Sequence, residues 1–260
     1  MKLTLLYKNL VIVCCVFVSS CATVSAPDER DPWESFNRSI YSFNDGFDRA
    51  IARPVASAYQ AVLPDFIETG ISNFFSNLGD VVVIVNDVLQ FKLVQAAQDF
   101  TRLLMNTTFG LLGFFDLASE MEVPKHDEDF GQTLATWGVG DGAYLILPFL
   151  GSSSVRDASG LVVDLSFLDP VTYIKDDEVR WSLIALRATD KRADLLSASR
   201  IVDKSGIDPY LFIRTAYYQI RENQIYDGNP PSSFEIKAPS QEDLLLEDEL
   251  EKELLLDSTR

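Results

Sequence analysis

The sequence predicts a mainly helical fold that contains one β-hairpin. Apolar residues recur at helical spacing through most of the chain, and helix-starting and helix-ending residues bracket these stretches. The dipeptide Asp141-Gly142 separates two segments of strand-like composition. With 260 residues, 47% of them hydrophobic, the chain is long enough for one large domain.

The first helix is expected to begin at Asp31-Pro32-Trp33-Glu34. Asp31 can cap it, Pro32 suits the first helical position, and Glu34 completes a capping-box pattern. Arg53-Pro54 is expected to end it. A largely aromatic stripe at helical spacing lies between these limits: Trp33, Phe36, Ile40, Phe43, Phe47 and Ile51.

The second helix is expected to run from Asp65 to a stop at Gly79. The β-branched run Val81–Val85 reads locally as a strand, and residues 89–103 return to helical spacing. Further on, Arg180–Ile201 reads as a strong helix. Asp208-Pro209 opens another, and residues 228–231 (Gly-Asn-Pro-Pro) close the folded region.

The exception to helix lies between residues 131 and 150. Thr133–Gly140 and Ala143–Leu147 flank Asp141-Gly142, a pair typical of a type I′ turn, so we expect a hairpin here. A hairpin alone is marginal in water and must pack on the helices or line something. It is either a docked surface element or a mobile apolar element.

The N-terminus predicts export and lipidation. Lys2 and Lys8 precede a short apolar stretch, and residues 18–21 (Val-Ser-Ser-Cys) then form a lipobox, so residues 1–20 read as a lipoprotein signal peptide. Cys21 is the expected lipid anchor, with residues 21–30 as a tether. An ordinary signal peptide with an incidental cysteine is the alternative. By analogy with bacterial lipoprotein sorting, Ala22 favours the outer membrane.

Charge excludes some partners. Cleavage before Cys21 removes Lys2 and Lys8 but no acidic residue, leaving 20 basic residues against 39 acidic ones, a net charge of −19. Nucleic acid needs clustered basic residues, and anionic headgroups would be repelled, so any membrane contact beyond the anchor must be apolar. The longest uncharged runs, Leu103–Phe115 and Gly142–Val155, are too short and too polar to span a bilayer.

The sequence offers few residues for catalysis. Cys14 and Cys15 leave with the signal, so neither a disulfide nor a cysteine-based metal site is expected. His126, the only histidine, lies in a charged loop and is expected to be solvated. Phosphate-binding and dinucleotide fingerprints are missing. An acid pair of the glycosidase type stays open, but the sequence favours a protein that is not an enzyme and has no cofactor or metal.

The last stretch differs from the rest. Residues 229–260 are acidic, with leucine triplets at 244–246 and 254–256. They read as a flexible tail or as a short amphipathic helix that docks a partner.

Between Asp31 and Tyr226 the chain resembles the VacJ/MlaA family of lipoproteins. The resemblance rests on long motifs in a fixed order: residues 31–38 (DPWESFNR), 43–45 (FND), 72–79 (SNFFSNLG), 85–87 (VND), 106–111 (NTTFGL), 129–134 (DFGQTL), 137–140 (WGVG), 142–144 (GAY), 147–148 (LP) and 154–157 (SVRD), with Asp190 and Arg192.

The resemblance implies a ring-like, mostly helical body around an amphipathic channel, monotopic in the inner leaflet of the outer membrane. It implies a lipoprotein on the periplasmic face that removes phospholipid from the outer leaflet and maintains lipid asymmetry. The implied partners are phospholipid, a porin trimer and a soluble periplasmic lipid-carrier protein, without any cofactor.

A channel that passes a lipid headgroup needs a few polar groups among apolar walls. Glycines beside the two aromatic residues of the expected hairpin suit a gate. Helix caps, loop hydrogen bonds and packing glycines would give the same pattern. The candidate channel or gate residues at motif positions are Asn73, Asn77, Asn86, Asn106, Trp137, Tyr144 and Arg156.

Two other functions stay open. The protein could be a structural lipoprotein that scaffolds porins without moving lipid, or a surface-exposed adhesion or spreading factor.

Overall fold

The computed structural model describes residues 29–202 and 208–231. The chain divides into two compact units, residues 1–206 and 207–260, and each is treated by itself. Cys21, the signal peptide, most of the tether and the leucine triplets of the tail lie outside the described residues.

The first unit opens with three consecutive helical segments, α2 (Glu34–Phe47), the π-helix η1 (Asp48–Ala52) and α3 (Arg53–Val62). The helix therefore begins later than expected, because the Asp31 side chain is buried and accepts a hydrogen bond from Asn37 rather than capping. It also continues past Pro54. The amide of Arg53 bonds to the Asp48 carbonyl five residues back, and this wider turn precedes the proline, which stands in the first turn of α3.

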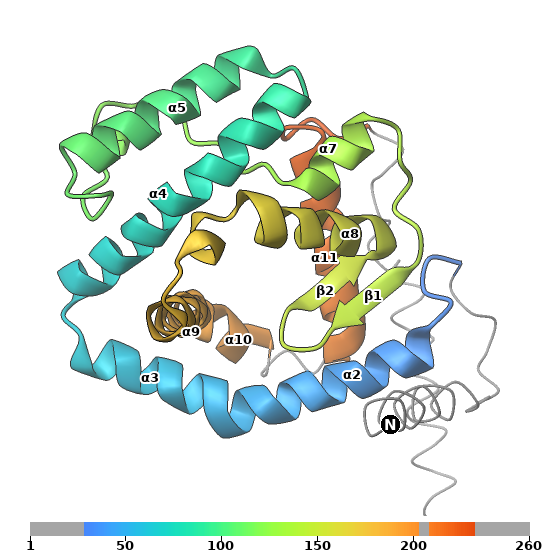
Figure 1. Cartoon of the computed structure of the whole chain (residues 1–260). Coiled ribbons are helices and arrows are strands. Elements are labelled where there is room, and N and C mark those ends of the chain that lie inside the picture. Colours follow the sequence, from blue (N-terminus) through green and yellow to red (C-terminus); the bar gives the residue numbers. More distant parts are fainter. Residues whose placement is uncertain (1–28, 203–207, 232–260) are drawn as a thin grey trace, which may run out of the picture. The chain divides into compact units, whose positions relative to one another are not determined.

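Helix α4 (Asp65–Leu89) folds back onto α5 (Leu93–Thr108) through a three-residue turn (Figure 1). The expected stop at Gly79 and the strand at Val81–Val85 are both wrong. Glycine inside a helix costs only about 1 kcal/mol, and burial of one face of α4 against α5 outweighs local β preference. Buried Asp80, Val83 and Asp87 lie at helical spacing on that face.

The hairpin is present but displaced from its expected position. Residues Phe130–Thr136 form helix α7, and β1 (Tyr144–Leu147) pairs antiparallel with β2 (Gly151–Ser154), Tyr144 opposite Ser154. The Asp129 carboxylate caps α7 by accepting from the Gln132 amide at 2.9 Å. The turn is 148–150, where Phe149 has a φ of 64°.

The remaining segments of the first unit are helical. They are the short α6 (Leu117–Glu120), α8 (Val155–Val163), the π-helix η2 (Asp164–Leu168), the 3₁₀-helix η3 (Pro170–Tyr173), α9 (Asp177–Asp194) and α10 (Leu196–Val202). The expected helix 180–201 is therefore two helices. In the second unit, α11 (Pro209–Ile225) begins as expected, with the Asp208 carboxylate accepting from the Tyr210 amide.

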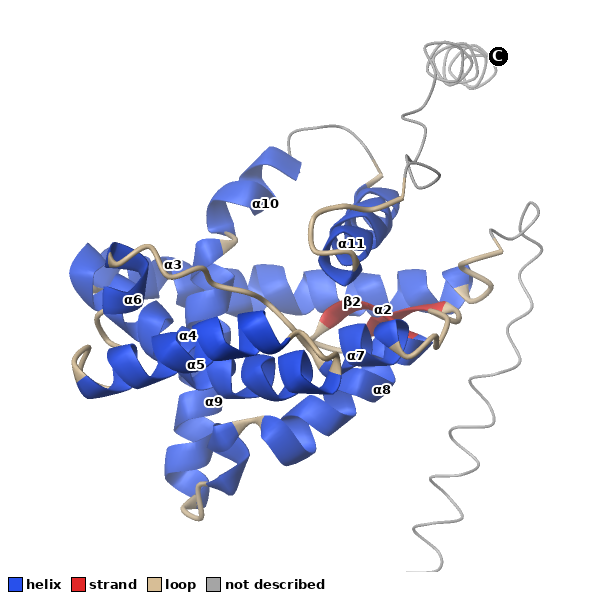
Figure 2. Ribbon diagram, turned by 90° about the horizontal axis from the view of Figure 1, so that it is seen from above, coloured by secondary structure: helices blue, strands red, loops and turns tan. Residues whose placement is uncertain are grey.

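Contacts between elements of the first unit form a closed circuit. The helices α2 and α3 run along one side; α9 and α4 follow; α7 contacts α4 and α8; and β1 contacts both α8 and α2 (Figures 1 and 2). The prediction of a mainly helical fold with one hairpin is confirmed for the described residues. None of the helices in these ranges combines the length and apolar character needed to cross a membrane.

Candidate functional site: a polar interior behind an apolar surface

Burial in the described residues is inverted relative to a soluble protein. The buried set contains 21 polar or charged residues and only 11 apolar ones, while 34 large apolar side chains are exposed. Apolar side chains normally fill the inside, and large exposed apolar patches mark binding or membrane surfaces. The outer surface of this protein is therefore built to contact something apolar.

Helices α4 and α5 show the inversion most clearly. The buried face of α5 carries Asp99, Arg102 and Asn106, whereas Val94 and Leu104 are exposed. Because α5 is amphipathic with its polar face inward, its helical periodicity alone does not reveal which face is buried.

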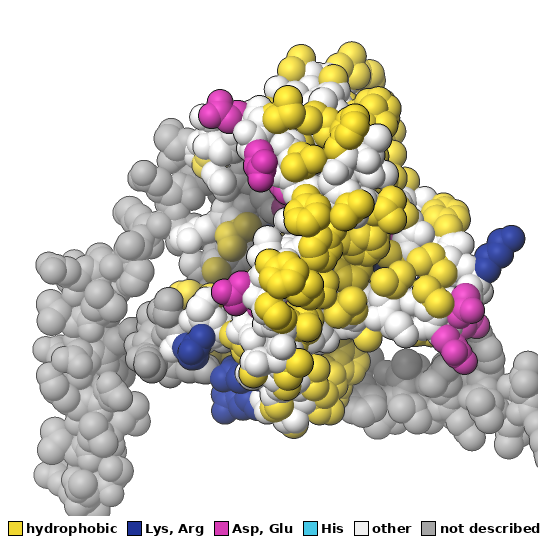
Figure 3. Space-filling view, turned by 90° about the vertical axis from the view of Figure 1, so that its left-hand side faces the viewer, with side chains coloured by type: hydrophobic (Ala, Val, Ile, Leu, Met, Phe, Trp, Pro, Cys, Tyr) yellow, Lys and Arg dark blue, Asp and Glu magenta, His cyan; other side chains and the backbone are white. Residues whose placement is uncertain are grey.

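On one side of the molecule, apolar side chains gather into a broad surface with charged side chains at its edges (Figure 3). That side includes the turn between α5 and α6, where Phe109 is 73% exposed, Leu111 70% and Leu112 63%. Leu111 and Leu112 both adopt positive φ, at 52° and 60°, which is strained for residues with a Cβ. The strained turn holds both leucines outward.

Two predicted site residues hold this turn from inside. The side-chain nitrogen of Asn77 donates to the Thr107 hydroxyl at 2.9 Å and to the Leu112 carbonyl at 3.4 Å. The Asn73 amide donates to the Phe114 carbonyl at 3.3 Å.

Arg102 connects α5 to the segment that follows the turn. Its buried guanidinium donates to Asp116 at 2.8 Å, to the Ser119 hydroxyl and to the Val123 carbonyl. Burial raises the pKa of Asp116, but hydrogen bonds from Ser119 and Asn106 and the charge of Arg102 outweigh it and lower that pKa to about 2. The carboxylate stays ionised, and the segment stays tied to α5.

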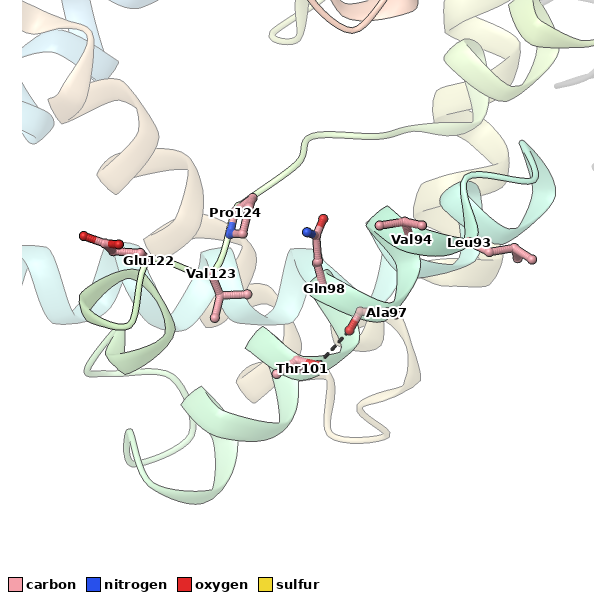
Figure 4. Close-up of a pocket in the computed structure, with 8 residues that line it drawn as sticks. All are labelled: Leu93, Val94, Ala97, Gln98, Thr101, Glu122, Val123 and Pro124. Atoms are coloured by element: carbon pink, nitrogen blue, oxygen red, sulfur yellow. Dashed lines mark hydrogen bonds between the residues drawn. The ribbon is translucent and has the colours of Figure 1, made fainter.

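A groove of about 630 Å³ lies between α5 and this segment (Figure 4). The Thr101 hydroxyl in its wall is already bonded to the Ala97 carbonyl, and the Glu122 carboxylate points away from α5. The groove is suited to an apolar chain. It is lined by Leu93, Val94, Ala97, Gln98, Thr101, Glu122, Val123 and Pro124.

Three acid–base pairs continue along the inner side of the same segment. Lys125 pairs with Asp80 at 2.7 Å, His126 with Asp99 at 2.6 Å, and Lys92 with Glu128 at 2.6 Å. The expectation of a solvated His126 is therefore wrong, because Nδ1 contacts a fully buried carboxylate.

Asn86 joins three elements at the centre of the polar interior. Its amide donates to Asp164 of η2 at 3.2 Å, and its oxygen accepts from the Thr133 hydroxyl of α7 at 2.8 Å. Asn106 likewise donates to Asp116 and accepts from the Ala118 amide. Both asparagines are buried, and the side-chain nitrogen and oxygen of each have hydrogen-bond partners.

The remaining three predicted residues lie near the hairpin. Tyr144 is fully buried, and its hydroxyl contacts Ser152 at 2.8 Å. Buried Arg156 pairs with Asp157 at 2.9 Å and with Asp141, which removes Asp141 from the expected turn. Trp137 is 53% exposed, donates to the Leu89 carbonyl, and stacks edge-on against Phe130.

The structure therefore brings the predicted residues together only in part. Asn73, Asn77 and Asn106 lie around the α5–α6 turn. Asn86, near the end of α4, contacts α7, and Trp137, directly after α7, contacts the end of α4. Tyr144 lies in the hairpin and Arg156 in α8. Their role in a channel or gate stays a prediction.

Sequence reasoning missed Asn37 and Asn44, which attach β1 to α2. The Asn37 side chain donates to the Tyr144 carbonyl and accepts from the Ile146 amide, while Asn44 donates to the Leu147 carbonyl. Their seven-residue spacing, which places both on one face of a helix, was the available signal.

Sequence reasoning also missed Asp87, which is fully buried on α4 and has no donor group bonded to either carboxylate oxygen. In the described ranges, no group of three or more His, Cys, Asp or Glu side chains is arranged to hold a metal ion.

Comparison with known proteins places this arrangement in a family. The family model described as MlaA lipoprotein matches residues 29–224. The Escherichia coli intermembrane phospholipid transport system lipoprotein MlaA is 40% identical over 222 residues, covering 80% of this chain and 84% of that protein.

The Haemophilus influenzae lipoprotein of the same name is 31% identical, covering 82% of this chain and 88% of that protein. A solved structure from work on the maintenance of bacterial outer membrane lipid asymmetry is 32% identical, with a TM-score of 0.66. It covers 76% of this chain and 99% of that one. The chain belongs to the MlaA lipoprotein family.

Proposed function

We propose that this protein is an outer-membrane lipoprotein that transports phospholipid between membranes and thereby maintains the lipid asymmetry of the outer membrane. Relatives in Escherichia coli and Haemophilus influenzae are named as intermembrane phospholipid transport lipoproteins. The observation that carries the proposal is the inverted burial: apolar side chains outside and a polar interior.

The protein lies in one leaflet, anchored by the lipid on Cys21 and held by its apolar surface. The closed circuit of element contacts supports a ring-like body. A monotopic position agrees with the finding that, among the described residues, no helix is both long and apolar enough to cross a membrane. Exposed Phe109, Leu111 and Leu112 then contact acyl chains, and the net charge of −19 plays no part in binding.

The inside of this ring provides an amphipathic channel. A phospholipid enters from the outer leaflet, its headgroup follows polar wall groups, and a soluble periplasmic carrier receives it. No covalent bond is made or broken. A porin trimer lies beside the protein, and nucleic acid has no role.

The predicted site residues divide into two roles under this proposal. Trp137, half exposed at the end of α7, stands at an opening. Asn73, Asn77, Asn86, Asn106, Tyr144 and Arg156 hold the wall, because each forms a hydrogen bond or an ion pair with a neighbouring segment.

A gene deletion tests the proposal. Phosphatidylethanolamine in the outer leaflet, measured by an impermeant amine-reactive label on intact cells, should rise in the deletion strain, and detergent sensitivity should rise with it. Wild-type protein expressed from a plasmid should restore both. Unchanged surface phospholipid in a clean deletion contradicts the proposal.

Two further measurements distinguish lipid transport from the two alternative functions, a porin scaffold and a surface adhesion factor. Phospholipid should co-purify with the detergent-extracted protein, whereas a pure porin scaffold carries none. Protease added to intact cells should leave the protein whole, whereas a surface adhesion factor would be cut.

A further inference from the structure

Asp87 differs from every other carboxylate around it. Its side chain is fully buried on α4, and neither oxygen accepts a hydrogen bond from a donor group. Three other buried carboxylates between α4, α5 and the segment before α7 have a basic partner: Asp80 has Lys125, Asp99 has His126, and Glu128 has Lys92. Of these four buried carboxylates, only Asp87 has none.

The charges that face Asp87 are mostly negative. Asp99 on α5 lies close enough to share a proton with it, and Glu128 adds a second negative charge, while Lys92 offsets them only in part. Asp164 on η2 binds Asn86 next along α4 instead. Burial first, then the charges of Asp99 and Glu128, raise the pKa of Asp87 to about 7.

These groups attach one segment, residues 122–129, which we call the strap. It leads from α6 to α7, and Arg102 holds its Val123 carbonyl at 2.7 Å. Three further attachments reach α4, α5 and the turn between them. Lys125 reaches Asp80, the His126 amide donates to Asp99 at 3.3 Å, and Glu128 contacts Lys92. Glu122, Val123 and Pro124 also form one wall of the groove along α5.

We propose that Asp87 is a pH-sensitive latch for the strap: with its proton in place the strap lies closed on α4 and α5, and loss of the proton releases it and opens the groove. A second buried negative charge beside Asp99 requires solvation, which the closed state does not supply because neither Asp87 oxygen has a hydrogen-bond donor. Under this proposal, lifting of the strap admits the water that solvates the charge. This device goes beyond lipid transport and does not rest on it.

The direction of the pH dependence follows from the linkage between protonation of Asp87 and closure of the strap. With the strap closed, the pKa of Asp87 is about 7; with it open and hydrated, the carboxyl returns to its ordinary value near 4. The closed state binds the proton more tightly, so closure weakens as pH rises from about 4 to about 7 and stays weak above. Between about pH 6 and about pH 8.5 the closing constant falls about tenfold.

Hydrogen exchange in the full-length, detergent-extracted protein tests the latch. After correction for the intrinsic pH dependence of exchange, protection of the strap amides should fall about tenfold from about pH 6 to about pH 8.5. Asp87→Asn, which keeps the shape of the protonated acid, should hold the strap closed at both values. Asp65→Asn, the same change at an exposed carboxylate on α4, should behave as wild type.

His126 of the strap also pairs with Asp99, so His126→Gln is the competing variant. Under the latch, His126→Gln lowers protection overall but keeps the fall with pH. Flat protection in wild type overturns the proposal, even if Asp87→Asn fails to fold. It is equally overturned if the fall persists in Asp87→Asn and disappears in His126→Gln.

Discussion

At the scale of single residues, buried side chains replace backbone pairing and hold loops. The side-chain amides of Asn37 and Asn44 each donate to one backbone carbonyl of β1 and accept from one backbone N–H, as a peptide group does. They occupy the edge of β1 where a third strand would lie. Two residues of a helix thus complete a two-stranded sheet that would be marginal alone.

Loss of the Arg102 side chain should destabilise the fold. Its guanidinium is 1% exposed and serves Asp116, Ser119 and the Val123 carbonyl together. Arg102→Met should lower the free energy of unfolding by about 3–5 kcal/mol, because Asp116 keeps its charge without the counter-ion. Urea unfolding in detergent micelles, followed by circular dichroism, measures the loss.

The control for this prediction is Arg49→Met. Arg49 is an arginine with an aspartate partner, Asp45, at 3.0 Å, but its side chain is 64% exposed. An exposed pair contributes less than about 1 kcal/mol. Equal losses in the two variants would show that the connection through Arg102 does not stabilise the fold.

At the scale of elements, local sequence signals predicted whether a segment is helix or hairpin better than they predicted the residues at which it begins and ends. The start of α11 at Asp208-Pro209 was predictable because a cap and a first-turn proline act over a few residues. The hairpin was not, because Asp141-Gly142 is a strong local turn signal that distant groups override. Arg156 takes the Asp141 carboxylate, and Asn37 fixes Tyr144 and Ile146 from more than a hundred residues away.

The polar interior was unpredictable for a related reason. Standard periodicity assigns the apolar face of a helix to the core, and α5 turns that face outward. The asparagines were recognisable as important from their motif positions. Which partners they bind depends on how α4, α5 and α7 meet, and no local pattern encodes that.

The crossing of α7 and α8 depends on glycine. A Cβ on Gly160 would lie 2.4 Å from the backbone nitrogen of Gly131 and 2.8 Å from its Cα. Gly160→Ala should therefore push the helices apart and destabilise the protein by about 3 kcal/mol. Thermal unfolding in detergent checks it.

Gly79→Ala should have the opposite effect on stability. A Cβ at Gly79, inside α4, meets no atom within 4 Å. Alanine there removes unfolded-state freedom and should stabilise by about 0.5–1 kcal/mol. Both variants add one methyl group to a helical glycine. Opposite effects on stability would therefore show that the close approach of Gly160 to Gly131 causes the loss. A neutral Gly160→Ala would mean that α7 and α8 separate freely.

At the scale of the whole molecule, charge and apolar surface have separate roles. A net charge of −19 on the mature chain gives no attraction to anionic lipid, so affinity for a bilayer must come from exposed apolar area. The lipid on Cys21 would then direct the protein to its membrane, while the apolar surface binds the bilayer. The mature chain without its lipid should still bind vesicles.

Binding of the chain that begins at Ala22 to neutral phosphatidylcholine vesicles measures this separation. The unlipidated chain should float with the vesicles. Leu111→Asp combined with Leu112→Asp should release it, because the two leucines together contribute about 3 kcal/mol or more, over about 100-fold in partition. Leu111→Ala with Leu112→Ala should lie between, since alanine loses area without adding charge. If the double aspartate variant floats as the parent does, the α5–α6 turn does not enter the membrane, and another part of the apolar surface seats the protein.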